Sequence, residues 1–227
     1  MRSLTGDHAG AAAQIAACRD AELVEIIIRG ERERAARWTD ERVASRLPTA
    51  VEMPDLAVYA RMATALLHGD ARAIHARLAA DARGVRSGGG RLVYRSGNVQ
   101  PFRSIIDTDD AIGAMLEGYD TSGLTYVPFA ALRRVTFLPP RNFIEELVRR
   151  ADVELRDGRK ATIVVPLLYA LSTTARDAAL RAGRLTTFRY VGSARRAIGQ
   201  RDFLLDDSCM VGMQHIAAIE FGGVHRA

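Results

Sequence analysis

The side chains that most often carry chemistry are few and widely spaced in this sequence. Its five histidines form no HExxH motif and no pair four residues apart, the spacing with which a helix holds a zinc ion. Cys18 and Cys209 are its only cysteines, too few for a thiolate metal site. Cys209 has a candidate partner in His215, but its surroundings, CMVGM, are typical of a small buried hydrophobic residue. No GxSxG, GxGxxG or Walker motif occurs, so we expect no catalytic residue, no metal and no cofactor.

An acidic cluster, Asp107, Asp109 and Asp110 in SIIDTDDAIGAMLEG, resembles the start of a calcium-binding loop. The sixth position of that loop holds isoleucine in place of glycine, and the twelfth holds glycine in place of glutamate. The sharp turn and the bidentate ligand of a calcium loop are therefore missing. Because aspartate is a frequent N-cap, we expect Asp109 or Asp110 to cap a short helix that runs to about Glu117.

The net charge of +5 raises the question of nucleic-acid binding. Lys160 is the only lysine, and the arginines alternate with acids, as in GERERAARWTDER at residues 30–42. Such interleaving indicates a solvated helix face and not a basic surface for nucleic acid. No window approaches the ~18 apolar residues of a membrane helix, and the N-terminus lacks the apolar core of a signal peptide. We therefore expect a cytoplasmic protein that binds neither nucleic acid nor membrane.

Two kinds of segment must position these side chains. Residues 1–84 are dominated by alanine, arginine and leucine with helical periodicity, whereas residues 98–227 contain short β-branched runs between turns. The glycine-rich residues 85–97 are expected to connect the two parts flexibly. The predicted fold class is α+β, with an N-terminal helical, degenerate TPR-like part followed by a small curved-sheet α+β domain.

The TPR-like interpretation rests on a weak repeat. LTGDHAGAAAQIAA begins at Leu4, LHGDARAIHARLAA begins at Leu67, and IRGERERAAR at Ile28 is a poorer copy. A glycine that ends one helix and an acid that begins the next would explain the shared Gly-Asp or Gly-Glu. Degraded tetratricopeptide hairpins have this pattern, and plain antiparallel helices without a binding role are about equally well supported.

The second part predicts mainly strands. We expect strands at residues 124–127 and 135–138, joined by one helical turn at residues 129–133 behind Pro128. RNFIEELVRR, which follows a Pro-Pro pair, predicts a short helix, and VELRDGRKATIVV predicts a hairpin with a type I′ turn at Asp157-Gly158. TTFRYV, DFLLDD and HIAAIEF are further strand candidates.

The order of these segments is also informative. A DxD stretch is followed by LEG, YVPF, RR, a Pro-Pro pair, LxDG, VPLLY, DAALRAGRLTTF, IGQR and IEF. From Asn98 to Phe221 this order resembles the ImpE family, also called SciE or TagJ, of type VI secretion accessory proteins. The chain departs from the family pattern at Tyr126, where tryptophan is favoured, and in PLLYALS, where a PxLYPGS-like stretch is usual.

The resemblance implies a non-enzymatic, cytoplasmic protein that binds the small, TssB-like sheath subunit of the secretion apparatus, near that subunit's N-terminal helix. The alternative is an enzyme or nucleotide-binding protein with a site at the junction of the two parts. Candidate partner-binding or family-motif residues are Asp107, Asp109, Tyr126, Pro128, Phe129, Arg133, Arg134, Gly199, Gln200 and Arg201.

Within that set, residues 126–129 are interpreted as a structural corner, with Pro128 at a sheet edge where no backbone donor is needed. One of Arg133 and Arg134 is expected to point outward and to pair with a carboxylate, for which Asp107 and Asp109 are the candidates. We expect the groove for the partner helix to lie within residues 98–227. The oligomeric state stays open.

Overall fold

The computed structural model describes residues 21–51, 56–68, 88–142, 144–191 and 194–222. Its helices are α2 (Ala21–Ala36), α3 (Glu41–Ala44), α4 (Ala57–His68) and α6 (Ala178–Arg181). Its strands are β1 (Gly90–Tyr94), β2 (Val99–Phe102), β3 (Ile105–Asp107), β4 (Met115–Asp120), β5 (Gly123–Pro128), β6 (Leu132–Phe137), β7 (Val148–Leu155), β8 (Lys160–Pro166), β9 (Thr186–Val191), β10 (Ala194–Gly199), β11 (Asp202–Leu205), β12 (Cys209–Gly212) and β13 (Ile216–Phe221). Short 3₁₀ turns are η3 (Phe129–Ala131), η4 (Ile144–Glu146), η5 (Ala170–Thr174) and η6 (Met213–His215).

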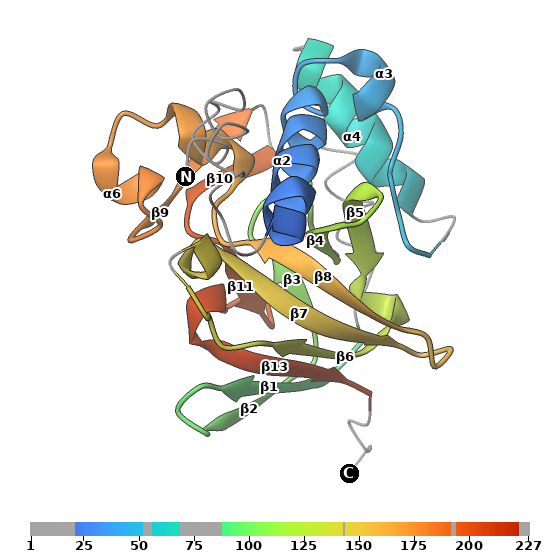
Figure 1. Ribbon diagram of the computed structural model, residues 1–227, viewed down its shortest axis with the longest axis vertical. Coiled ribbons are helices and arrows are strands. Elements are labelled where there is room, and N and C mark those ends of the chain that lie inside the picture. Colours follow the sequence, from blue (N-terminus) through green and yellow to red (C-terminus); the bar gives the residue numbers. More distant parts are fainter. Residues whose placement is uncertain (1–20, 52–55, 69–87, 143, 192–193, 223–227) are drawn as a thin grey trace.

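Antiparallel sheets dominate the fold (Figure 1). The largest has eight strands in the order β2-β1-β13-β6-β7-β8-β4-β5. A three-stranded sheet, β12-β11-β3, and the hairpin β10-β9 complete the strand pairing of the described residues. The helices α2 and α4 gather over the end of the large sheet that holds β8, β4 and β5 (Figure 1).

Two hydrophobic clusters fill the interior. One lies between the large sheet and the three-stranded sheet, where the Phe129 ring is 6.0 Å from that of Phe203 and 5.7 Å from that of Phe221. The other joins Ile27 of α2 and Met62 of α4 to side chains of β4 and β5. Because this second cluster draws on both the N-terminal helices and the sheet, the two share one apolar interior.

The predicted fold class is wrong. Thirteen antiparallel strands and four helices, of which two have only four residues, do not make a TPR-like helical part in the residues that the structure describes. The repeat copy at Leu4 and most of the copy at Leu67 lie outside those residues. All but the last residue of the copy at Ile28 lies inside one continuous helix, α2, whose apolar side chains join a core cluster with β4 and β5.

The glycine of that copy explains how α2 packs. Gly30 is in the helix interior, where a Cβ atom would lie 2.2 Å from the Tyr119 ring. The missing side chain therefore lets the helix backbone rest directly on β4. The buried stripe of α2 continues from Leu23 and Ile27 to Glu31 and Arg34. The interpretation of GERERAARWTDER as a solvated face is therefore wrong for Glu31, Arg34 and Arg37, which are all buried.

The acidic cluster does not cap a helix. Residues 108–114 form bends and turns, and β4 begins at Met115. The Asp107 carboxylate accepts a hydrogen bond from the backbone N–H of Asp109, and the Asp109 carboxylate accepts one from that of Ala111. These local bonds stabilise turns in place of a helix.

The corner at Pro128 is confirmed. β5 is an outer strand of the large sheet, and Pro128 is its last residue. The helical turn η3 follows it, with Phe129 fully buried, and β6 begins at Leu132. The strands predicted at TTFRYV, DFLLDD and HIAAIEF are also confirmed as β9, β11 and β13.

Two predictions for the next segment need correction. RNFIEELVRR forms only the turn η4 before β7 begins at Val148, because pairing with β8 imposes an extended backbone. The β7–β8 hairpin is confirmed, but its turn is not type I′, since only Gly158 has a positive φ, +89°. The Leu155 carbonyl accepts from the Gly158 N–H, which gives a three-residue loop with glycine in the left-handed position.

The contact between Gly30 and Tyr119 predicts an unusual sign for one substitution. Gly→Ala inside a helix ordinarily stabilises by roughly 0.5–1 kcal/mol. We expect Gly30→Ala to lower the free energy of unfolding by about 1–3 kcal/mol, because the new methyl group overlaps a buried ring. Urea denaturation measures this, with Gly30→Ala in a Tyr119→Leu background as the control. An ordinary stabilising effect in the wild-type background would contradict this packing of α2.

Candidate functional site

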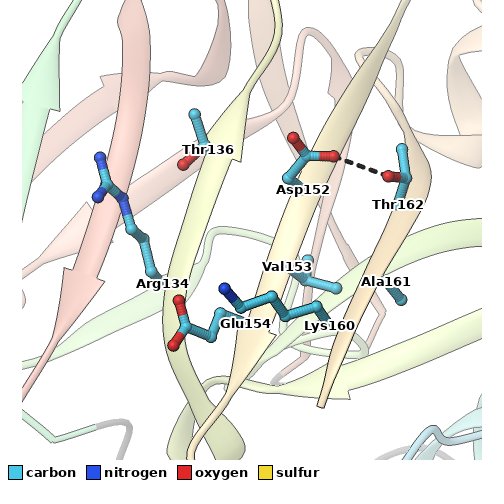
Figure 2. Close-up of a pocket in the computed structure, with 8 residues that line it drawn as sticks. All are labelled: Arg134, Thr136, Asp152, Val153, Glu154, Lys160, Ala161 and Thr162. Atoms are coloured by element: carbon cyan, nitrogen blue, oxygen red, sulfur yellow. Dashed lines mark hydrogen bonds between the residues drawn. The ribbon is translucent and has the colours of Figure 1, made fainter. Parts of the chain in front are cut away.

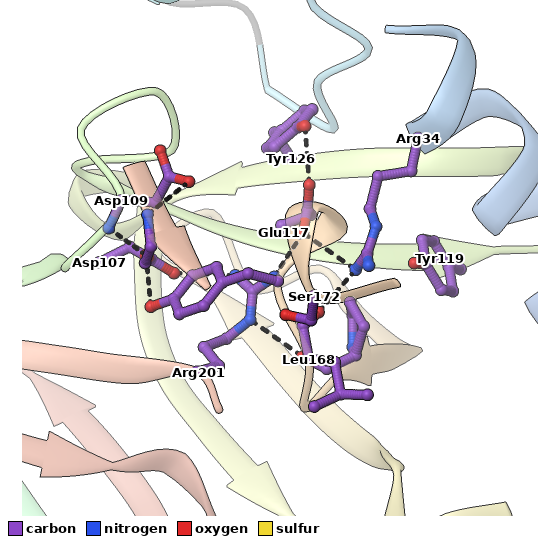
Figure 3. A network of polar contacts seen from close by, with 12 residues as sticks. Arg34, Asp107, Asp109, Glu117, Tyr119, Tyr126, Leu168, Ser172 and Arg201 are labelled. Carbon is purple, nitrogen blue, oxygen red and sulfur yellow. Dashed lines mark hydrogen bonds and ion pairs between the residues drawn. The ribbon is translucent and has the colours of Figure 1, made fainter. Parts of the chain in front are cut away.

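Arg201 lies at the centre of a buried network of charges (Figure 3). It precedes β11, and its guanidinium donates from Nη1 to Asp107 Oδ2 at 2.8 Å, from Nη2 to Glu117 and from Nε to the Pro166 carbonyl at 2.9 Å. It also lies over the Tyr169 ring, 5.2 Å from the centroid. One cation thus joins β3, β4 and the end of β8.

Glu117 extends the network to α2. Its Oε1 accepts a hydrogen bond from the Tyr126 hydroxyl at 2.9 Å, and its Oε2 lies 3.5 Å from Arg34 Nη1 (Figure 3). Arg34 also lies 3.4 Å from Glu31 and donates to the Leu168 carbonyl at 3.0 Å. The inward charges of α2 thus pair with each other and with residues more than eighty positions away in the sequence.

Each aspartate of the acidic cluster has its own arginine. Asp107 pairs with Arg201, and Asp109 accepts from Arg196 Nε at 2.8 and 3.0 Å. Asp110 accepts from the backbone N–H of Arg195 at 2.8 Å, and its carboxylate lies 3.7 Å from that residue's guanidinium. The three carboxylates therefore turn to different cations. Within the described residues, no three His, Cys, Asp or Glu side chains are grouped closely enough to hold a metal ion.

The network contains more carboxylates than cations, and this affects protonation. Arg34 and Arg201 face three carboxylates, those of Glu31, Asp107 and Glu117. Burial raises the pKa of Asp107 to about 7, against the opposing effect of Arg201. Burial also acts to raise the pKa of Glu117, but Arg201 and Arg34 outweigh it, and the pKa of Glu117 lies below its ordinary value. The pKa shifts of the two carboxylates that face Arg201 therefore differ in direction, and Asp107 holds a proton more readily than Glu117.

Two buried tyrosines, Tyr169 and Tyr126, also belong to the network and donate hydrogen bonds to its carboxylates. The Tyr169 hydroxyl contacts Asp107 Oδ1 at 2.9 Å and Thr108 Oγ1 at 2.9 Å, and it accepts from the backbone N–H of Asp202 at 3.0 Å. Burial raises the pKa of Tyr169, and the Asp107 charge raises it further. The pKa of Tyr126 is raised in the same way, by burial first and then by the charge of Glu117. Both pKa shifts keep the phenols neutral, as hydrogen-bond donors to the carboxylates.

The other candidate residues of the interior have backbone roles. Gly199 has φ +102° and lies where a Cβ would be 2.0 Å from the Leu185 carbonyl oxygen. Its N–H donates to Ser172 Oγ at 2.7 Å. Gln200, 5% exposed, pairs through its backbone with Leu168 and Leu185. The GQR segment therefore positions the Arg201 guanidinium.

Arg133 and Arg134 lie outside the network, on the exposed face of β6. A bulge between Leu132 and Arg134 shifts the β6–β7 register, and both arginines are consequently exposed. Arg133 pairs with Glu154 at 3.1 Å and Arg134 with Glu220 at 3.6 Å. The expected pairing of either arginine with an aspartate of the acidic cluster is therefore wrong.

A ladder of alternating charge crosses this exposed face. The register places Arg91, Glu220, Arg134, Glu154 and Lys160 opposite one another on five neighbouring strands. Figure 2 shows the last three around a polar cavity of about 540 Å³ on β6, β7 and β8. Opposite charges facing each other across strands stabilise the sheet modestly. The ladder offers a charged surface without a recognisable catalytic pair.

A comparison with protein families shows which family the chain belongs to. The family described as "ImpE protein" matches residues 99–220, the span that contains the acidic cluster, the corner and the GQR segment. The chain belongs to the ImpE family. Family membership associates the chain with type VI secretion.

A solved structure has the same fold as this ImpE-family chain. The crystal structure of protein VPA1032 from Vibrio parahaemolyticus has a TM-score of 0.69 and 13% sequence identity, and the match covers 98% of this chain and 84% of that one. No curated protein matches the chain. None of the described helices is long and apolar enough to cross a membrane.

The arrangement favours a positioning role over chemistry. Asp107, Glu117 and Arg201 are each at most 1% exposed, and each bonds to other groups of the network. None of them lines the cavity on β6, β7 and β8 or a second cavity between α2, α3 and β5. Glu117, Arg34 and Tyr169 were not among the residues predicted from the sequence. The spacing of Arg34 from Leu23 and Ile27, which places all three on one helix face, was a usable signal.

The burial of Arg201 predicts a large effect of removing it. Arg201→Met would leave the buried Asp107 without its cation and Glu117 with Arg34 alone, and we expect a loss of about 3–5 kcal/mol in the free energy of unfolding. Arg133→Met is the matched control: it removes an ion pair whose arginine is 68% exposed, so its cost should be below about 1 kcal/mol. Similar losses in urea denaturation of the two variants would contradict the central role of Arg201.

The pKa of Asp107 predicts a pH dependence with a definite sign. Its value is about 7 in the folded protein and about 4 in an unfolded chain, so the folded state binds this proton more tightly. The contribution to stability is complete below about pH 4 and is lost as the pH rises through about 7. Glu117 acts in the opposite sense, since its lowered pKa stabilises the fold above about pH 4.5 and this is lost on further acidification.

We therefore expect the free energy of unfolding from urea titrations to rise from about pH 8 to about pH 5 through the Asp107 proton. Asp107→Asn cannot titrate, so its increase over this range should be smaller than that of the wild type. Equal pH profiles for the two proteins would show that Asp107 does not take up the proton.

Proposed function

We propose that this chain is a non-enzymatic, cytoplasmic accessory protein of a type VI secretion system that binds the small sheath subunit through that subunit's N-terminal helix. One observation carries the proposal: the family match over residues 99–220 covers segments whose polar residues are buried and paired with one another. Polar side chains that pair with one another in the interior stabilise the fold and are not free to act on a substrate. This favours a binding protein over an enzyme.

The rival function is an enzyme or nucleotide-binding protein with a site at the junction of helices and sheet. A cavity of about 580 Å³ does lie there, between α2, α3 and β5. Its charged lining is Glu33, Arg37, Arg42 and Arg46, and its apolar lining is Val43, Leu47, Pro48 and Leu124. No nucleophile with an adjacent base is among these residues, which favours the binding function.

The ten candidate residues divide into two roles under this proposal. The interior residues, with Arg201 as their centre, hold the frame and affect binding only through stability. Arg134 belongs to the exposed charge ladder and Arg133 lies beside it on β6, where both are accessible to a partner. Rim charges of this kind act mainly on the rate of association.

The test is calorimetry between the full chain and the small sheath subunit of the same secretion system. We expect a dissociation constant in the micromolar range, typical of a short helix in a groove, and loss of binding when the subunit lacks its N-terminal helix. The full chain is needed, because Ile27, Tyr59 and Met62 complete the core beside β4 and β5. Equal binding by the helix-deleted subunit, or no binding at all, would refute the proposal.

A further inference from the structure

The cavity between α2, α3 and β5 has aliphatic walls and a basic lining. We call it the α2–β5 groove and define it by the lining residues given above. Arg42 and Arg46 are exposed at its rim. Glu33, its one acid, already accepts a hydrogen bond from the Leu124 N–H at 2.7 Å. Three arginines against one glutamate leave the groove with an excess of two positive charges.

Arg37 distinguishes this groove from the rest of the molecule. It is fully buried, donates from Nη1 to the Arg46 carbonyl at 2.6 Å and from Nη2 to the Tyr59 carbonyl at 3.4 Å, and leaves its Nε without a hydrogen-bond partner. Its guanidinium lies 5.1 Å from the Tyr126 ring centroid and 5.8 Å from that of Trp38. Carbonyls and rings surround this cation, but no carboxylate of the described residues lies within the 4.0 Å of an ion pair with it.

Unlike Arg37, the other buried arginines have a carboxylate partner. In the part of the chain that the structure describes, each of them lies within 4.0 Å of a carboxylate, and they are Arg34, Arg149, Arg196 and Arg201. A buried charge without a counter-ion is costly, and an arginine forms its strongest hydrogen bonds with carboxylates. Arg37, the buried arginine without such a partner, lines the α2–β5 groove.

We infer that the α2–β5 groove binds an apolar segment of a partner protein that carries a carboxylate, and that this carboxylate pairs with Arg37. Arg42 and Arg46 attract the acidic segment and move aside as it enters, while Val43, Leu47 and Leu124 contact its apolar side chains. The aliphatic walls favour a peptide carboxylate over a nucleotide, whose base would need a stacking surface. The inference deepens the proposed function and rests on it only for the identity of the partner.

The first test uses a synthetic probe. An acetylated and amidated helical peptide of about 14 residues, near the shortest length at which helices form in water, carries Glu at every fourth position between leucines. A matched peptide has Gln at those positions. With ¹⁵N-labelled full chain, the Glu peptide should shift the Arg37 Nε–H resonance and bind about tenfold more tightly than the Gln peptide.

Variants at the rim leave the interior intact. Arg42→Gln with Arg46→Gln should slow association of the Glu peptide about threefold to tenfold, and more at low salt than at high salt. Arg189→Gln, an exposed arginine on β9, is the matched control and should change nothing. The small sheath subunit should compete with the Glu peptide for the groove.

Three results would overturn the inference. They are equal affinity of the Glu and Gln peptides, binding that leaves the Arg37 Nε–H unshifted, and an Arg37 signal that responds to ADP in preference to the Glu peptide. If the small sheath subunit binds the full chain without competing with the Glu peptide, the groove is not its site, and the proposed function survives alone. If the Glu peptide binds as expected and the subunit does not bind, the carboxylate site stands and the proposed partner fails.

Discussion

The ion pairs of Arg201 are the constraint on which the rest of the structure depends. A guanidinium with no exposure to water needs carboxylates of fixed position, and here they come from β3 of the small sheet and β4 of the large sheet. The two sheets can therefore stack in only one arrangement that satisfies the charge. Arg34 fixes the position of α2 in the same way, because it pairs with Glu117 of β4. A buried ion pair contributes little net stability but is expensive to break, so its value lies in specifying one arrangement.

This constraint separates the interior of the molecule from its surface. The polar residues that carry the family resemblance hold each other in place, so they are poor candidates for direct contact with a partner. The surface offers two different features instead: the charge ladder on β6–β8 and the basic, aliphatic α2–β5 groove. Binding can thus vary at the surface while the internal frame stays fixed.

The sequence predicted what short-range chemistry determines. The corner at Pro128, the β7–β8 hairpin and the late strands follow from proline geometry, a glycine turn and β-branched runs. Predictions from the sequence failed where residues far apart in the sequence determine the local structure by contacting each other. RNFIEELVRR has a helical pattern, but its last three residues are extended by pairing with β8. The acids and arginines of α2 have the pattern of a solvated face, but Glu117 and Tyr119 of β4 pair with two of them in the interior. The motifs identified Asp107, Tyr126 and Arg201 separately, but no pattern in one sequence reveals that they meet.

Native-state hydrogen exchange tests most directly whether these buried charges unite α2 and the sheets into one cooperative unit. If they do, the amides of α2 exchange with the same free energy and the same denaturant dependence as the Arg201 amide, which donates to the Leu167 carbonyl. Exchange of α2 in a separate opening, with a lower free energy and a smaller denaturant dependence, would contradict this cooperativity. The helical residues would then be an independent part of the protein.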